Sequence, residues 1–281
     1  MNIMEFYNGW QKILDIGTTD NKIVGYSRAS FKTGLILLPL KICLDAGVCN
    51  QYEPNMVLVT HGHTDHVGEL YNILIGNSRK FKVPVVSTPN LIHHISNYIN
   101  SMMSMNRGCN SKYNKWEPCA LVDKKRFEIQ GKTIELEPFA MDHKVESIGF
   151  GISEIRDKLK PEFEGLTTNE LIEKKKTYKI TFEMAFPMCL FCGDTGIGAL
   201  PTIPFAKFPI VIIESTFLHP DDIGEAREKK HLHITDLEPV FLAHHSTMFV
   251  LIHFSTRYDL EKLKEYQVTY EGIYSNIRFF V

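Results

Sequence analysis

The sequence lacks the features of a membrane or secreted protein. No stretch of its 281 residues approaches the roughly 18 uninterrupted apolar residues that a membrane-spanning helix needs. Its first twenty residues show no basic segment followed by an apolar one, so we expect no signal peptide. The six cysteines are scattered along a chain too long to need disulfide bonds. We therefore expect a soluble intracellular protein of the cytoplasm or the nucleus.

The sequence also has no surplus of positive charge and no linker. Its net charge is −2 at pH 7, whereas a domain that binds nucleic acid is commonly basic. Cations do gather at residues 124–126, 174–176 and 227–230, and each run fits either a solvated surface or a track for phosphates. There is no internal repeat, low-complexity tract or Pro/Gly/Ser-rich linker. With 44% hydrophobic residues, the composition predicts one globular domain over residues 1–281.

Short apolar runs that end in polar clusters recur along the chain. The expected strands are residues 34–44, 55–60, 82–87, 132–141, 148–153, 188–193, 208–213 and 249–254. Helices are expected to begin near residue 66 and to cover residues 91–105, 235–244 and 260–266. In α/β proteins the ends of strands are where functional sites are usually built. The patterns therefore favour an α/β fold, and two sheets flanked by helices would fit them.

The densest polar cluster follows the expected strand at residues 55–60. It reads His-Gly-His-Thr-Asp-His and contains His61, His63, Asp65 and His66. Imidazole and carboxylate are the natural ligands of zinc and similar metals. His61 and His63 are two residues apart on an extended segment and can point the same way, whereas Asp65 and His66 begin a helix and face a second point. The motif therefore predicts ligands for two metal ions.

Further ligands are expected at the ends of other strands. His143 lies between two expected strands, Asp194 follows the strand at residues 188–193, and His253 lies at the end of the last strand. Each of these residues alone fits a structural role as well as a metal ligand. Together with the first motif they complete an inventory of five histidines and two aspartates for two metal ions.

In this order, the motifs resemble the metallo-β-lactamase superfamily. H-x-H-x-D-H is followed by a later His, by G-D-T and by H-F-S-x-R-Y. The resemblance is closest to ribonuclease Z, the tRNA 3′-processing endonuclease, in its short plant-type form. It extends to FEGLTTNEL, VIIESTFLHPDD and KKHLHITDLEPV, and is strongest over residues 43–258. It implies the metallo-β-lactamase fold, a four-layer αββα sandwich of two mixed β-sheets flanked by helices.

The resemblance also implies two Zn²⁺ ions per chain, with Mn²⁺ or another divalent metal as the alternative. One ion would be held by His61, His63 and His143, the other by Asp65, His66 and His253, and Asp194 would bridge them. Asp45, in C-L-D-A-G, would support the metal loop from behind, although a plain turn residue is an equal interpretation.

The implied reaction removes the 3′ trailer from precursor tRNA by attack of a metal-activated water, leaving a 3′ hydroxyl. Asp65 would orient or deprotonate this water in addition to binding metal. His233 in H-I-T would donate a proton to the leaving oxygen, with Glu214 of E-S-T-F as its partner. His231 is the competing candidate, and we prefer His233 because Thr235 follows it in register. By the same resemblance we expect a homodimer.

A tRNA-gripping arm is expected between the His143 and Asp194 motifs, as in bacterial relatives. Here the interval, about residues 154–178, is expected to be compact and lacks their Gly-Pro signature. Lys174, Lys175 and Lys176 are expected to contact tRNA phosphates there. Arg257 fits either a phosphate contact or a structural role. Residues 25–34 stand where many members carry the P-x-K-x-R-N loop that rejects tRNA ending in CCA, so discrimination against such tRNA stays open.

Two other functions fit part of the pattern. A dinuclear-metal hydrolase of another ester, such as a cyclic-nucleotide phosphodiesterase or a thioesterase, would share the ligands but would not need Glu214, His233 or a basic tRNA surface. A catalytically silent RNA-binding homologue is disfavoured by the complete ligand set, because such proteins tend to lose metal ligands first.

Overall fold

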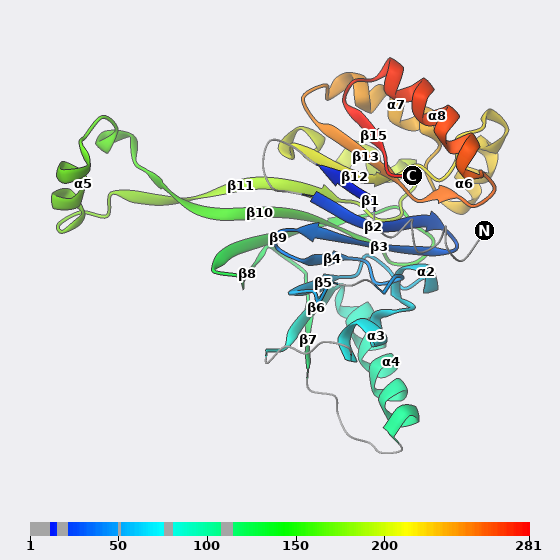
Figure 1. Cartoon of the computed structure of the whole chain (residues 1–281), viewed down its shortest axis with the longest axis horizontal. Coiled ribbons are helices and arrows are strands. Elements are labelled where there is room, and N and C mark those ends of the chain that lie inside the picture. The colour runs from blue at the N-terminus through cyan, green and yellow to red at the C-terminus, as the bar shows by residue number, and fades with distance from the viewer. Residues whose placement is uncertain (1–11, 16–21, 50–51, 76–80, 108–114) are drawn as a thin grey trace.

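Two mixed β-sheets form the centre of the structure (Figure 1), a computed structural model that describes residues 12–15, 22–49, 52–75, 81–107 and 115–281. The first sheet has eight strands, in the order β1-β2-β3-β4-β5-β6-β7 with β14 paired to β2. They are β1 (Lys12–Asp15), β2 (Lys22–Ala29), β3 (Lys32–Leu38), β4 (Ile42–Leu44), β5 (Met56–Leu58), β6 (Val83–Ser87), β7 (Trp116–Ala120) and β14 (Phe254–Ser255). Neighbours are antiparallel from β1 to β4 and parallel from β4 to β7.

The second sheet has seven strands in the order β15-β13-β12-β11-β10-β9-β8. They are β8 (Lys125–Ile129), β9 (Lys132–Ala140), β10 (Ile148–Leu159), β11 (Thr181–Phe191), β12 (Ile210–Glu214), β13 (Met248–Ile252) and β15 (Ile277–Phe279). Neighbours among β11, β12, β13 and β15 are parallel. Because parallel strands end at one edge of a sheet, the residues that follow β11, β12 and β13 are brought together there.

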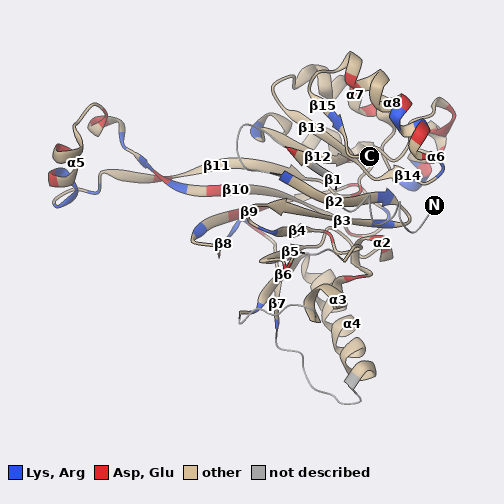
Figure 2. Cartoon of the chain, viewed as in Figure 1, with Lys and Arg blue, Asp and Glu red and all other residues tan. Residues whose placement is uncertain are grey.

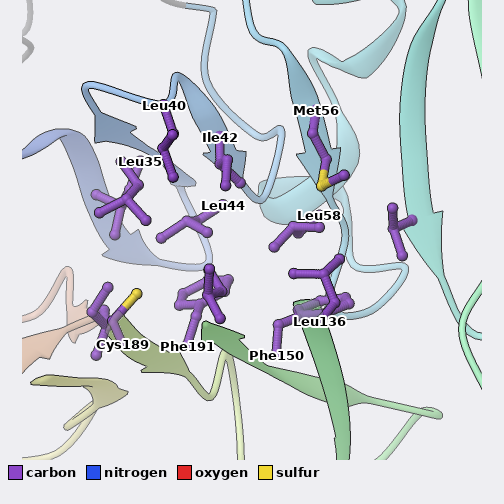
Figure 3. Close-up of a cluster of buried hydrophobic side chains, with 14 of the residues drawn as sticks. Leu35, Leu40, Ile42, Leu44, Met56, Leu58, Leu136, Phe150, Cys189 and Phe191 are labelled. Carbon is purple, nitrogen blue, oxygen red and sulfur yellow. The ribbon is translucent and has the colours of Figure 1, made fainter. Parts of the chain in front are cut away.

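The inner faces of the two sheets pack against each other and form the central core (Figure 3). Leu44 and Leu58 of the first sheet lie in the same cluster as Phe150 and Phe191 of the second, and all four are fully buried. Burial of a side chain of this size stabilises the fold by about 1.5–3 kcal/mol. This core fixes the distance between the two sheets, and with it the distance between the loops at their edges.

Helices cover the outer faces of both sheets (Figure 1). The helices of the described chain are α2 (Thr64–Val67), α3 (Leu70–Ile75), α4 (Pro89–Arg107), α5 (Thr168–Lys175), α6 (Ile223–Lys229), α7 (Ile234–Ala243) and α8 (Leu260–Ile273), of which α5 lies away from the two sheets. Ile95 of α4 packs in one cluster with Val57 of the first sheet, and Leu237 of α7 packs with Val211 of the second. The order helix, sheet, sheet, helix is the predicted four-layer arrangement. No helix in the described part of the chain is long and apolar enough to cross a membrane.

Residues 34–44, predicted as one strand, form two. β3 ends at Leu38, and β4, which begins at Ile42, pairs with it in the antiparallel sense. Pro39 has no N–H to donate to a sheet, and Lys41 has a φ of 54°, in the left-handed region that reverses the chain. The apolar run therefore contains a turn.

The interval between the His143 and Asp194 motifs is an extended arm (Figure 1), not a compact insertion. β10 and β11 pair without interruption from Ser153↔Pro187 to Leu159↔Thr181, beyond the ends predicted for them, and α5 lies at the tip. Thr167 caps α5 through a reciprocal hydrogen-bond pair with Glu170. The predicted boundaries were wrong because this ribbon is exposed on both faces, so its strands lack a continuous apolar run.

Replacing the fully buried Phe191 with alanine should lower the free energy of unfolding by about 3–5 kcal/mol, because it leaves a cavity between the sheets. Chemical denaturation measures this change. Phe182→Ala is the matched control, since Phe182 lies on the same strand but is 38% exposed on the arm. Equal destabilisation of the two variants would contradict the assignment of the core.

Candidate metal centre

Three histidine nitrogens converge on one point beside the end of β5. The Nε2 atom of His61 lies 3.0 Å from Nδ1 of His63, which lies 3.3 Å from Nε2 of His143. The loop after β5 supplies the first two residues, and the segment between β9 and β10 supplies the third. These three histidines are the group predicted for the first metal ion.

A second group lies where α2 faces the end of β13. The Nε2 atoms of His66 and His253 are 3.2 Å apart, and the Oδ2 atom of Asp65 lies 3.6 and 3.5 Å from them. His253 has a φ of 63°, a conformation that non-glycine residues adopt rarely and that is often found at functional sites. The structure thus brings together all three residues predicted for the second ion.

Asp194 lies between the two groups. Its Oδ2 atom is 3.7 Å from Nε2 of His61 and 3.4 Å from Nε2 of both His66 and His253. Its Oδ1 atom is buried and has no hydrogen-bond partner among the described residues. The preceding Gly193 has a φ of 62°, and a Cβ there would lie 2.6 Å from Thr60, so the turn that carries Asp194 requires glycine. This placement suits a bridging ligand.

The distances within the two groups fit metal ions. Zinc binds histidine nitrogens at about 2.0–2.1 Å, so two nitrogens on one tetrahedral ion lie about 3.3 Å apart. The three histidine pairs described above lie at 3.0, 3.3 and 3.2 Å. The donor atoms fall into clusters whose members lie within 4.8 Å of one another. Geometry and donor chemistry together fit a dinuclear metal site.

The electrostatics of the site favour neutral imidazoles on one side. Burial and the neighbouring histidines hold the pKa of His61 well below its usual range, and the pKa of His143 is also lowered, mainly by burial. For His66, burial lowers the pKa, but the carboxylates of Asp194 and Asp45 raise it well above the usual value. The buried carboxylates therefore attract positive charge, which a metal ion supplies.

Asp45 supports the metal loop from behind. Its Oδ2 atom accepts a hydrogen bond from Nδ1 of His66 at 2.7 Å, and its Oδ1 atom accepts one from the backbone N–H of Thr60 at 2.7 Å. Asp45 is fully buried and has a φ of 58°. A carboxylate against Nδ1 orients the ring so that Nε2 faces the metal.

His231, not His233, is the histidine that pairs with Glu214. Nδ1 of His231 lies 2.7 Å from Oε1 of Glu214 and 4.0 Å from Oδ2 of Asp194. Its ring stacks on that of His253 with 5.5 Å between centroids. His231 also groups with Asp194 and His253 as a possible metal-binding cluster. However, the nitrogen that faces Asp194 is the one bonded to Glu214, so a proton-carrying role fits better than ligation.

His233 lies outside the metal centre. It is the N-cap of α7, where Nδ1 accepts from the backbone N–H of Thr235 and Nε2 donates to the carbonyl oxygen of His219 at 3.0 Å. Its backbone N–H donates to the carboxylate of Asp236, three residues later. This capping-box spacing was the sequence signal that would have separated His233 from His231. The predicted pair of His233 with Glu214 is therefore not formed.

The residues predicted to contact RNA lie on separate parts of the fold. Arg257 forms ion pairs with Asp222 and Glu225 and covers the ring of Phe217, so its guanidinium serves the structure of this loop. Lys174, Lys175 and Lys176 lie at the end of α5, on the arm. The structure does not bring Arg257 into the metal cleft.

The metal centre opens into a cavity of about 400 Å³ lined by Ser30, Phe31, His63, Thr64, Asp65, Asp194, His231 and His253. Ser30 and Phe31 come from the turn between β2 and β3. This turn lies within residues 25–34, which stand where related proteins carry the P-x-K-x-R-N loop. Residues of both metal groups and His231 therefore line one cavity that a substrate can enter.

Comparisons with known proteins show the family and the fold of this chain. The model of the family described as "Beta-lactamase superfamily domain" matches residues 50–254. The protein tRNase Z TRZ1 of Arabidopsis thaliana is 28% identical over 253 residues, which cover 86% of this chain and 88% of the relative. The structure of human tRNase Z, short form, superposes with a TM-score of 0.56 at 13% identity, covering 90% of this chain and 93% of that one. A diphosphatase from the PhnP family superposes with a TM-score of 0.54 at 10% identity, covering 89% and 81%.

Proposed function

The chain belongs to the β-lactamase superfamily, and we propose that within it the protein is an endoribonuclease that removes the 3′ trailer from precursor tRNA. Its mixed sheets and flanking helices are the metallo-β-lactamase fold, as the sequence predicted, and it is a metal-dependent hydrolase. The observation that carries the proposal is the pairing of His231 with Glu214 beside a dinuclear site, in a chain 28% identical to a tRNase Z.

Within this proposal, the two groups would hold Zn²⁺, an ion well suited to histidine and carboxylate ligands, with Mn²⁺ or another divalent metal as the alternative. Bound ions would activate water and neutralise charge on the phosphate under attack. Asp65 lines the cavity, where its carboxylate can orient the attacking water or take its proton. Asp194 lies between the two groups of ligands and would contact both ions.

His231 is the proposed proton donor to the leaving 3′ oxygen. Burial lowers the pKa of His231, but Glu214 and Asp194 raise it to about 9. Both nitrogens of the ring therefore carry a proton at neutral pH. Glu214 is fully buried and accepts from the backbone N–H groups of Thr195 and Leu232, which leaves it an acceptor for Nδ1 of His231. His231 itself is 14% exposed in its side chain and lines the cavity.

The arm is the proposed grip on the body of the tRNA. Acidic residues are as numerous as basic ones along residues 153–187, and both charges are spread over the arm (Figure 2). The exception is the run Lys174, Lys175 and Lys176 at the end of α5, followed by Lys179. Contacts to phosphates need a few cations at the right positions and no net positive charge on the whole arm. A neutral arm with one basic end therefore fits this role.

Neutralising Lys174, Lys175 and Lys176 together should weaken tRNA binding and flatten the dependence of affinity on salt, by about one unit of slope for each phosphate that a lysine no longer neutralises. Binding is measured at several salt concentrations. Glu162→Gln with Glu164→Gln is the control of opposite sign, and we expect it to leave binding unchanged or strengthen it. Unchanged affinity after removal of the three lysines would place the tRNA grip elsewhere.

The proposed function is tested by incubating the metal-loaded protein with a precursor tRNA that carries a 3′ trailer and mapping the products. We expect one cut after the discriminator nucleotide, abolished by chelation. Bis(p-nitrophenyl) phosphate is assayed in parallel. Hydrolysis of this dye without cleavage of RNA would favour the second candidate, a phosphodiesterase for small esters, which the similarity to a diphosphatase structure and the absence of net positive charge also suit.

A further inference from the structure

Thr216 and Thr60 occupy equivalent positions beside the two halves of the metal centre. The hydroxyl of Thr216 lies 2.5 Å from Oε2 of Glu214 and 3.0 Å from Nδ1 of His253. The hydroxyl of Thr60 lies 2.9 and 3.0 Å from the two carboxylate oxygens of Asp45 and 3.0 Å from Nδ1 of His61. Both threonines are buried, at 3% and 0% exposure.

The direction of these hydrogen bonds follows from counting hydrogens. A hydroxyl has one hydrogen to donate, and carboxylate oxygens accept. Glu214 already accepts backbone N–H groups, and Asp45 accepts the N–H of Thr60, so both act as acceptors. Each hydroxyl therefore donates to its carboxylate and accepts from the nearest imidazole. That imidazole must carry its proton on Nδ1. For Thr216 this is His253 at 3.0 Å, since Nδ1 of His231 is 3.4 Å away and is bonded to Glu214 at 2.7 Å.

A proton on Nδ1 leaves Nε2 as the nitrogen with a free lone pair. In His253, Nε2 lies 3.4 Å from Oδ2 of Asp194 and 3.2 Å from Nε2 of His66, and in His61 it lies 3.0 Å from Nδ1 of His63. Both lone pairs thus point to the places where the ligand atoms converge. His66 is oriented by Asp45 directly at 2.7 Å, whereas His61 and His253 are reached through a hydroxyl.

We propose that Thr60 and Thr216 are positioning residues, one for each metal ion, which fix the Nδ1–H tautomer of His61 and of His253 and so present Nε2 to the metal. In this arrangement Asp45 supports two ligands, His66 directly and His61 through Thr60. Glu214 likewise serves two groups, His231 through Oε1 and, through Thr216, the ligand His253. The carboxylate of Glu214 then orients both the proton donor His231 and the metal ligand His253.

Metal affinity tests the proposal without any substrate. Removal of a group that orients a metal ligand typically weakens metal binding by about 10–100-fold. We expect Thr216→Val to weaken one of the two ions by this factor and Thr60→Val to weaken the other, measured by competition of Zn²⁺ with a chromophoric chelator. Thr216→Ser and Thr60→Ser keep the hydroxyl and should keep both affinities near those of the unsubstituted protein.

Two further measurements separate this role from a purely structural one. The Nδ1–H resonance of His253 should disappear or shift in Thr216→Val but persist in Thr216→Ser, while unfolding of the metal-free valine variant stays cooperative. If Thr60→Val does not fold, the comparison of Thr216→Val with Thr216→Ser tests the proposal on its own. Unchanged affinity in Thr216→Val, or equal weakening in valine and serine variants, would overturn the proposal. It rests on the metal site of the proposed function, but because no RNA is involved, its failure is distinct from failure of RNA cleavage.

Discussion

Replacing His231 with alanine should lower the kcat of RNA cleavage by about 10²–10⁴-fold, the usual contribution of a general acid. The physical reason is that Glu214 holds Nδ1 of His231 at 2.7 Å, which fixes the ring in the cavity and leaves the proton on its other nitrogen, Nε2, to pass to the leaving oxygen. Single-turnover cleavage of precursor tRNA measures the effect. Both metal ions should remain bound, since His231 is not assigned as a ligand.

His233→Ala is the matched control, two residues away. It should cost at least about 1 kcal/mol of stability, because it removes the helix cap together with a buried ring that donates to the carbonyl oxygen of His219, and it should leave kcat nearly unchanged. A large decrease of kcat in His233→Ala with none in His231→Ala would show that the proton donor is the residue first preferred from the sequence, and would contradict the pairing seen in the structure.

Replacing Asp194 with alanine should abolish hydrolysis of every phosphodiester, dye or RNA. Its Oδ2 atom lies within 3.7 Å of ligand nitrogens from both metal groups, so its removal takes a ligand from each ion and leaves the clustered imidazoles without the carboxylate between them. Metal content by atomic spectroscopy and turnover of the dye are measured on the same sample.

Asp194→Asn separates charge from shape in the same experiment. The amide keeps an oxygen for one ion but removes the negative charge that attracts two, so we expect reduced metal content and activity close to that of the alanine variant. Normal activity with a full complement of metal in Asp194→Ala would contradict the two-metal interpretation.

The clustering of the candidate metal ligands could be predicted from the sequence because much of it is local. His61, His63, Asp65 and His66 follow a buried strand and begin a short helix, so their spacing alone separates them into two groups. The later ligands His143, Asp194 and His253 all follow strands of one sheet, and the parallel arrangement brings the ends of β11 and β13 to the same edge. Continuous apolar runs predicted the parts of these strands that are buried on both faces, residues 189–191 of β11 and residues 249–252 of β13.

The residues that the sequence misplaced depend on tertiary structure. His231 and His233 are two residues apart, and although the capping-box spacing of His233 with Asp236 hints at their different roles, the ring that turns toward Glu214 is seen only in the folded chain. The roles of Thr60 and Thr216 depend on their hydrogen bonds to Asp45 and Glu214, which only the folded chain shows. The arm was expected, but its length and the ends of its two strands were not, because an exposed ribbon needs no apolar periodicity to pair its strands.

The most direct test of the proposed function is a titration of Zn²⁺ into the metal-free protein while cleavage of a 3′-extended precursor tRNA is followed. We expect cleavage to rise to a plateau at two ions per chain, with a single cut after the discriminator nucleotide and a 3′ hydroxyl on the product. A plateau at one ion, cleavage without metal, or no cleavage of RNA at two ions per chain would contradict a dinuclear tRNA 3′-processing enzyme.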